Sequence, residues 1–240
     1  MNGNLFAPEK FAQALELIKD LTSNGMLYAL WETFYATVLS TLFALVIGLP
    51  IGVILVVGEK DGILPLPAWL MKTLNVIINL LRSVPFLILM IVVFPLSRLI
   101  IGTTVGTLAS IVPLVIASFP FIARLVESSL RETDRNVIEA AESMGASPFE
   151  IIVKVMIPES FPSLISNATI AITTILGYTA MSAAVGGGGL GKVAINYGYY
   201  KYNYPVMLVA VVVLVLLVQV FQSVGTKLAE KADKRLKKRS

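Results

Sequence analysis

The 240-residue sequence contains no cysteine and no histidine. Without cysteine, disulfide bonds and thiolate metal sites are excluded. Without histidine, the chain lacks the usual general base near neutral pH and the commonest metal ligand. We therefore expect no catalytic residues, no metal site and no bound cofactor, and we expect that this chain is not an enzyme.

Charge is also scarce, because 14% of the residues are charged and 56% are hydrophobic. A typical soluble domain has about a quarter of its residues charged. A soluble core of this length could not hide so much apolar surface, whereas a lipid bilayer can solvate it. The composition predicts an all-α, multi-pass protein of the cell membrane.

Long uncharged windows divide the chain into candidate spans. A helix crosses the bilayer core with about 20 apolar residues, and this length predicts about five transmembrane helices within one membrane domain, residues 27–226. The expected spans are 31–57, 73–97, 99–123, 160–186 and 203–224. The second contains Arg82, with Asn75 and Asn79 on the same helical face. Because a buried arginine is costly in lipid, we expect this face to point at protein or water.

A basic tail follows the last apolar window. Residues 227–240 hold seven of the 19 lysines and arginines. Such a stretch is typical of a cytoplasmic anchor rather than of a nucleic-acid site, so no nucleic-acid partner is expected. With the tail inside, most other basic loop residues also fall inside. This asymmetry predicts an external N-terminus and a cytoplasmic C-terminus.

The first 26 residues contain an amphipathic pattern. Apolar side chains recur at helical spacing among charged ones, at Phe11, Ala14, Leu15, Ile18 and Leu21. This pattern predicts a helix that lies on the membrane surface or on the rest of the protein.

The polar segment 134–154 predicts two short helices joined by a tight turn on the cytoplasmic side. Asp134 or Thr133 can cap the first helix, and Gly145 suits a left-handed position that ends it. Ser147, Pro148 and Glu150 then form a capping box that starts the second helix. Ala140 and Ala141, flanked by Glu139 and Glu142, would suit a small docking element. An ordinary amphipathic loop helix fits the same pattern equally well.

A longer motif contains this segment. The motif consists of Glu139-Ala140-Ala141, three further residues, Gly145, nine further residues, and Val155-Met156-Ile157-Pro158. It resembles the EAA loop of ABC importer permeases. Valine and isoleucine stand where the family pattern has isoleucine and leucine. The resemblance implies coupling helices that seat in grooves of ATP-binding subunits. The implied coupling residues are Glu139, Ala140, Ala141, Gly145, Ser147, Pro148 and Pro158.

A wider likeness extends from about residue 30 onward and is similar to the methionine-uptake permeases of bacterial membranes. It is carried by residues 79–86, 120–124, 177–181 and 186–191. It implies a permease that alternates between outward and inward access in a dimer with a second copy of itself. The implied partners are two ATP-binding subunits, which use ATP and magnesium, and an external substrate-binding protein. Methionine as substrate follows from this likeness alone, and another small amino acid fits the residues equally well.

The fourth expected span is rich in small and hydroxyl residues, which suits close helix packing. The same helix could line a pathway at the dimer axis, with Tyr178, Met181 and Ser182 as a constriction. Arg82 could pair with a substrate carboxylate, or could hold a helix end or reach toward the inner surface.

Other functions leave signatures that this sequence lacks. A stand-alone secondary carrier usually has internal repeats and ionisable residues at the bilayer midplane, and here only Arg82 interrupts the interior of an expected span. The run Gly186–Lys192 approaches a phosphate-binding loop. Val193 follows it where a serine or threonine would hold magnesium, so we expect a flexible or tightly packed backbone there.

Overall fold

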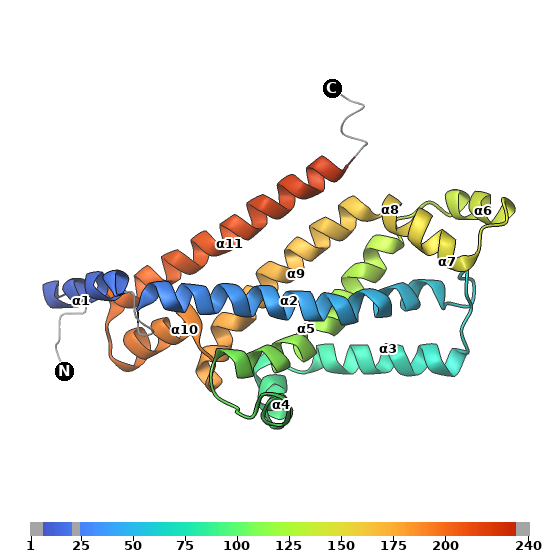
Figure 1. Cartoon of the computed structure of the whole chain (residues 1–240). Coiled ribbons are helices and arrows are strands. Elements are labelled where there is room, and N and C mark those ends of the chain that lie inside the picture. The colour runs from blue at the N-terminus through green and yellow to red at the C-terminus, as the bar shows by residue number, and fades with distance from the viewer. Residues whose placement is uncertain (1–6, 21–24, 234–240) are drawn as a thin grey trace. The chain divides into compact units, whose positions relative to one another are not determined.

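The computed structural model describes residues 7–20 and 25–233, and every regular element within these ranges is a helix (Figure 1). The prediction of an all-α chain is thereby confirmed. Expectations that involve Leu21 or the basic residues beyond 233 fall outside the described residues. Within the described part of the tail, the last long helix continues to Ala232.

Four helices are long and apolar enough to cross a membrane. They are α2 (Met26–Val57), α5 (Thr107–Leu130), α9 (Phe161–Ser182, extended by the 3-10 turn Ala183–Val185) and α11 (Tyr204–Ala232). A bent pair of shorter helices would bring the number of spans to five. This number agrees with the expected architecture.

The bent pair replaces the single expected span over 73–97. Helix α3 (Ala68–Ser83) ends before Val84, which is extended, and α4 (Phe86–Ile101) begins after Pro85. Proline has no N–H to donate and disfavours helical dihedrals in the residue before it, so a straight helix cannot pass this point. The expected third span also begins later than position 99. Gly102 ends α4 in a left-handed conformation, and α5 starts only at Thr107.

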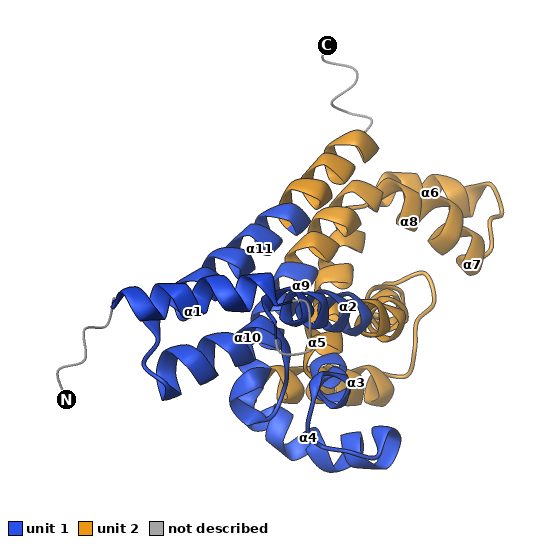
Figure 2. Ribbon diagram, turned by 60° about the vertical axis from the view of Figure 1, so that its left-hand side comes forward, with its two compact units in different colours: residues 1–41, 85–116, 172–221 blue, residues 42–84, 117–171, 222–240 orange. Residues whose placement is uncertain are grey.

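The chain divides into two compact units, coloured in Figure 2. Unit 1 comprises residues 1–41, 85–116 and 172–221, and unit 2 comprises residues 42–84, 117–171 and 222–240. The core of unit 1 gathers α1 (Pro8–Lys19) with parts of α2, α10 (Gly189–Val193) and α11. The core of unit 2 gathers parts of α2, α3 and α5 around Leu55, Ile78 and Ala123.

Gly52 marks the closest approach of α2 and α5 within unit 2. A Cβ atom at this position would lie 2.6 Å from the carbonyl oxygen of Ala123. Only glycine allows the two backbones to approach so closely.

Short helices fill the connection between α5 and α9. They are α6 (Arg135–Ser143), α7 (Pro148–Ile151), the π-helix η1 (Ile152–Met156) and α8 (Ile157–Glu159). A second π-helix, η3 (Ala194–Tyr200), follows α10 and leads to α11.

Candidate functional site: the elbow between α5 and α9

Residues 134–159 form the two-helix bend that the sequence predicts, and we call them the elbow. Asp134 caps α6, because its carboxylate accepts a hydrogen bond from the Asn136 N–H at 2.9 Å. Gly145 has a φ of 82°, the left-handed conformation that ends α6 at little cost for glycine alone. The turn is therefore specified by local residues.

The second arm of the elbow starts with a complete capping box. The Ser147 hydroxyl accepts from the Glu150 N–H at 3.4 Å, and the Glu150 carboxylate accepts from the Ser147 N–H at 3.1 Å. The Ser147 hydroxyl also donates to the Glu150 carboxylate at 2.9 Å, and Lys154 donates a third hydrogen bond to that carboxylate at 2.8 Å. The Lys154 ammonium and the two Ser147 donors lower the pKa of Glu150 to about 2.

A π-turn carries the second arm past Pro158. The Ile157 N–H bonds to the carbonyl of Ile152, five residues earlier. Proline cannot donate to a preceding carbonyl, and a π-turn redistributes the backbone bonds in front of it. Pro158 therefore marks the place where the arm turns toward α9.

Side-chain hydrogen bonds close the elbow at its base, where α5 ends and α9 begins. The hydroxyls of Thr133 and Ser160, at the two ends of the elbow, lie 2.9 Å apart and are buried. Ser163 donates to the Glu132 carboxylate at 2.8 Å. Asn167 donates to the Ser129 hydroxyl at 2.7 Å. These contacts tie the elbow to two long helices at once.

The elbow exposes several large apolar side chains. Met144 is 82% exposed and Phe149 is 74% exposed, and Val137 lies two turns before Met144 on α6. Between them Ala140 is small and exposed, whereas Ala141 is buried and anchors α6 to the rest of unit 2. Soluble proteins rarely expose such patches unless a partner covers them. We call Val137, Ala140, Met144, Gly145 and Phe149 the docking face.

A polar groove of about 780 Å³ runs beside α6. Glu139 and Glu142 line it from α6, and Glu139 pairs with Arg135 at 3.1 Å. Glu59 and Arg131 line its other side. Glu139 of the EAA pattern and the nearby Glu142 thus line a charged groove, while the alanine and glycine positions of the pattern form the docking face or its support.

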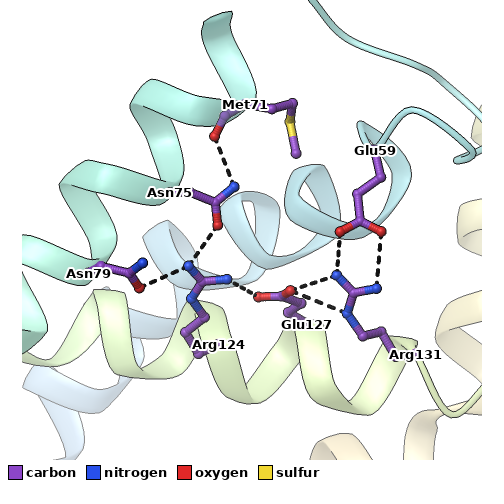
Figure 3. Close-up of polar contacts among 7 residues, drawn as sticks. All are labelled: Glu59, Met71, Asn75, Asn79, Arg124, Glu127 and Arg131. Carbon is purple, nitrogen blue, oxygen red and sulfur yellow. Dashed lines mark hydrogen bonds and ion pairs between the residues drawn. The ribbon is translucent and has the colours of Figure 1, made fainter. Parts of the chain in front are cut away.

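A chain of polar contacts connects this groove to α3 (Figure 3). Arg131 makes two hydrogen bonds to Glu59, at 2.6 and 3.1 Å, and two to Glu127, at 2.8 and 3.2 Å. Glu127 also pairs with Arg124 at 2.6 Å. Arg131 lowers the pKa of the Glu59 carboxyl through these hydrogen bonds. The end of α2 and the end of α5 are therefore held by a shared ionic network.

The same network ends on the polar face of α3. Arg124 donates to Asn75 at 2.7 Å and to Asn79 at 3.0 Å (Figure 3). The sequence places these asparagines on one face with Arg82, but it does not reveal their partner 45 or more residues away. A sequence signal for this network does exist. Arg124, Glu127 and Arg131 recur at i, i+3 and i+7, the spacing of a charged stripe along the end of α5 and the residue that follows it.

The four pathway residues expected from the sequence lie in different units. Tyr178, Met181 and Ser182 belong to unit 1 and Arg82 to unit 2. Tyr178 stacks on Phe86, with ring centroids 4.2 Å apart. Met181 is exposed, and the buried Ser182 hydroxyl donates to the Thr179 carbonyl. Arg82 is exposed and, among the described residues, has no hydrogen-bond partner.

The glycine run is tightly packed. Glu32, which the sequence analysis passed over, accepts hydrogen bonds from the Gly189 N–H at 2.9 Å and the Thr107 hydroxyl at 2.7 Å. The Leu190 N–H donates to Thr33 at 2.8 Å. A Cβ atom on Gly188 would overlap the Thr107 hydroxyl. Backbone N–H groups that would cradle a phosphate are thus already bonded to side chains of α2.

Comparisons with known proteins agree with this architecture. Residues 48–238 match the family described as binding-protein-dependent transport system inner membrane component. A probable D-methionine transport system permease protein MetI of Vibrio cholerae is 46% identical over 216 residues, covering 90% of this chain and 95% of the relative. The D-methionine transport system permease protein MetI of Escherichia coli K12 is 46% identical over 151 residues, covering 63% and 69%.

Solved structures give the same result. A crystal structure of the MetNI methionine ABC transporter in an inward-facing conformation matches with a TM-score of 0.85 and 43% identity, covering 87% of this chain and 96% of the other. An amino acid ABC transporter solved with histidines has a TM-score of 0.73 at 15% identity, which shows a shared fold alone.

Apolar membrane-spanning helices with a two-helix elbow between α5 and α9, together with these matches, define a multi-pass permease of the bacterial inner membrane. The chain belongs to the family of inner membrane components of binding-protein-dependent transport systems. Within that family, its similarity is to the methionine transport permeases.

The capping box makes a pH prediction. Because the pKa of Glu150 is lowered from 4.5 to about 2, its charged form should support the turn fully above pH 4.5 and lose that support progressively as the pH falls from 4.5 through about 2. A carbon-13 NMR titration of Glu150 in micelles should give a midpoint near 2. Lys154→Met should raise the midpoint toward 4.5. A midpoint near 4.5 in the unmodified chain would contradict this geometry.

The Arg124 network makes a stability prediction. Asn75→Ala removes an acceptor from a charged donor, so we expect the free energy of unfolding to fall by about 1–3 kcal/mol. Arg82→Ala, on the same helix, should change it by less than about 0.5 kcal/mol. Reversible unfolding in micelles measures both. Equal losses in the two variants would show that the network does not hold α3.

Proposed function

We propose that this chain is the membrane-spanning subunit of an ATP-driven importer for methionine. Two copies would form the pathway, two ATP-binding subunits would bind the elbows from the cytoplasm, and an external binding protein would deliver the substrate. ATP and magnesium would be bound by the partner subunits rather than by this chain. The observation that carries the proposal is an exposed apolar docking face on a rigid elbow in a chain of the permease family.

The docking face has the chemistry of a coupling element. Met144 and Phe149 offer large apolar side chains, which stabilise an interface most when a partner buries them. Gly145 has no atom within 4 Å of its missing Cβ position, so a partner's backbone can approach the tip closely. Glu139 and Glu142, on the groove side, can fix the orientation of a partner that carries basic residues.

The base of the elbow supplies the mechanical link. Thr133 and Ser160 hold its two ends together, so the elbow should move as one body with the ends of α5 and α9. A partner that binds one arrangement of the elbows more tightly when it holds ATP would shift the permease between its two access states. Hydrolysis would reverse that bias.

Methionine as the substrate is supported by the printed names of the relatives, which describe D-methionine transport in Vibrio cholerae and Escherichia coli. We further propose that Tyr178, Met181 and Ser182 on α9 contribute to the constriction of the pathway. The exposed Met181 thioether is suited to a sulfur-bearing side chain. The exposed Arg82 is proposed to reach toward the inner membrane surface rather than to bind the substrate carboxylate.

A second candidate function is import of another small amino acid by the same mechanism, since no described side chain selects a thioether over a similar apolar group. A stand-alone secondary carrier is the third. Uptake that continues in membranes without any ATP-binding subunit would favour the carrier.

Gly145 provides the sharpest test of coupling. A β-branched residue in a left-handed conformation costs about 1–2 kcal/mol, roughly a tenfold change in population, whereas asparagine tolerates that conformation. Gly145→Val should therefore abolish most ATP-driven uptake, and Gly145→Asn should retain most of it. Uptake and ATPase activity in proteoliposomes measure both effects, with membrane insertion equal in the two variants. Glu139→Lys should also lose uptake.

Full uptake by Gly145→Val would remove the coupling role of the elbow. If the valine variant instead lost uptake in the same proportion as its level in the membrane, the glycine would be required for folding alone.

A further inference from the structure

Helix α1 presents three different faces, and only one of them packs on protein. Successive side chains of a helix are separated by about 100°. Ala14 and Leu17 share one face and are buried at 3% and 8% exposure. Their cluster also contains Met26 of α2 and Val206 of α11. Helix α1 therefore lies against the first turns of two membrane-spanning helices within unit 1.

Two hydrogen bonds fix α1 in this position. Lys10 donates to the carbonyl of Tyr202 at 2.8 Å, and Asn203 donates to the Gln13 side chain at 2.7 Å. Tyr202 has a φ of 53°, an unusual conformation for a residue with a side chain. The turn that leads into α11 is thus held by α1.

The second face of α1 is apolar and uncovered. Phe11, Leu15 and Ile18 are exposed at 50%, 56% and 39%. Their spacing of four and three residues keeps them within one stripe. The third face carries Glu9, Glu16 and Lys19. The first face of α1 therefore packs on protein, the second suits apolar surroundings and the third suits water. A helix that lies in the plane of a membrane interface has the same arrangement.

We propose that α1 lies at the boundary between lipid headgroups and acyl chains, with Phe11, Leu15 and Ile18 inserted among the acyl chains. The occupant of the apolar face is the bilayer, because α1 packs against the first turns of α2 and α11, and these turns also expose apolar side chains, Leu27 at 50% and Leu208 at 48%. Near the same ends, Trp31 is 58% exposed and Tyr28 is 42% exposed. Exposed tryptophan and tyrosine are enriched where spans leave the bilayer.

Apolar insertion, rather than attraction to charged headgroups, drives this contact. Acidic and basic residues nearly balance along α1, with Glu9, Glu16 and Asp20 against Lys10 and Lys19. Binding to anionic lipid would call for an excess of basic side chains. The helix thereby ties the turn at Tyr202 to the membrane surface, a role separate from the transport activity proposed above.

The absence of cysteine allows a direct test. Two single-cysteine variants, Leu15→Cys and Ile18→Cys, probe the apolar face. Glu16→Cys, at the position next to Leu15, is the matched control on the charged face. Each is spin-labelled in the full chain, in nanodiscs of phosphatidylethanolamine and phosphatidylglycerol. Electron paramagnetic resonance then measures collision with oxygen, which concentrates in lipid, and with a water-soluble nickel chelate.

Labels at Leu15→Cys and Ile18→Cys should collide several-fold more with oxygen than with nickel, and the label at Glu16→Cys should show the reverse preference. Equal nickel access at the Leu15 and Glu16 positions would overturn the proposal, because both faces would then be in water. Exclusion of both reagents from the Leu15 position would also overturn it, because a second copy or another protein would then cover the face.

Discussion

The closure of the elbow at its base is the constraint on which the functional account depends. Thr133 and Ser160 stand at the two ends of a 26-residue excursion, and their buried hydroxyls lie 2.9 Å apart. Buried hydroxyls that lose a partner cost about 1–3 kcal/mol, so the pair resists separation. Ser163 and Asn167 bond across the same junction, so the end of α5 and the start of α9, from which the elbow projects, are held together.

The ionic network extends this stiffness beyond the elbow. Arg131 lies just before α6 and bonds to Glu59 at the end of α2, and Arg124 lies two turns earlier and bonds to α3. A displacement of the elbow would therefore reach α2, α3, α5 and α9 within unit 2 through polar contacts of defined geometry. Two-state switching needs such rigid connections, because loose ones would absorb the motion at the docking face.

Local chemistry made the elbow predictable from the sequence, and long-range packing made other features unpredictable. Gly145 and the Ser147 capping box specify their turn through neighbours only a few residues away. The span expected over 73–97 is divided at Pro85 into α3 and α4, a bend that hydropathy alone does not reveal. The partner of Asn75 and the role of Glu32 depend on residues 49 and 157 positions away, and no periodicity in one sequence reports such pairs.

The central claim is that an ATP-driven partner grips the docking face of the elbow. The most direct measurement is photo-cross-linking from a single cysteine at Met144, which is 82% exposed, in the assembled transporter, with a cysteine at the 65% exposed Val46 in the middle of α2 as the control. The account predicts that Met144→Cys captures the ATP-binding subunit and that the yield changes between ATP-bound and nucleotide-free states. Failure of Met144→Cys to capture that subunit, or its labelling by a reagent confined to the outer side of the membrane, would contradict the account.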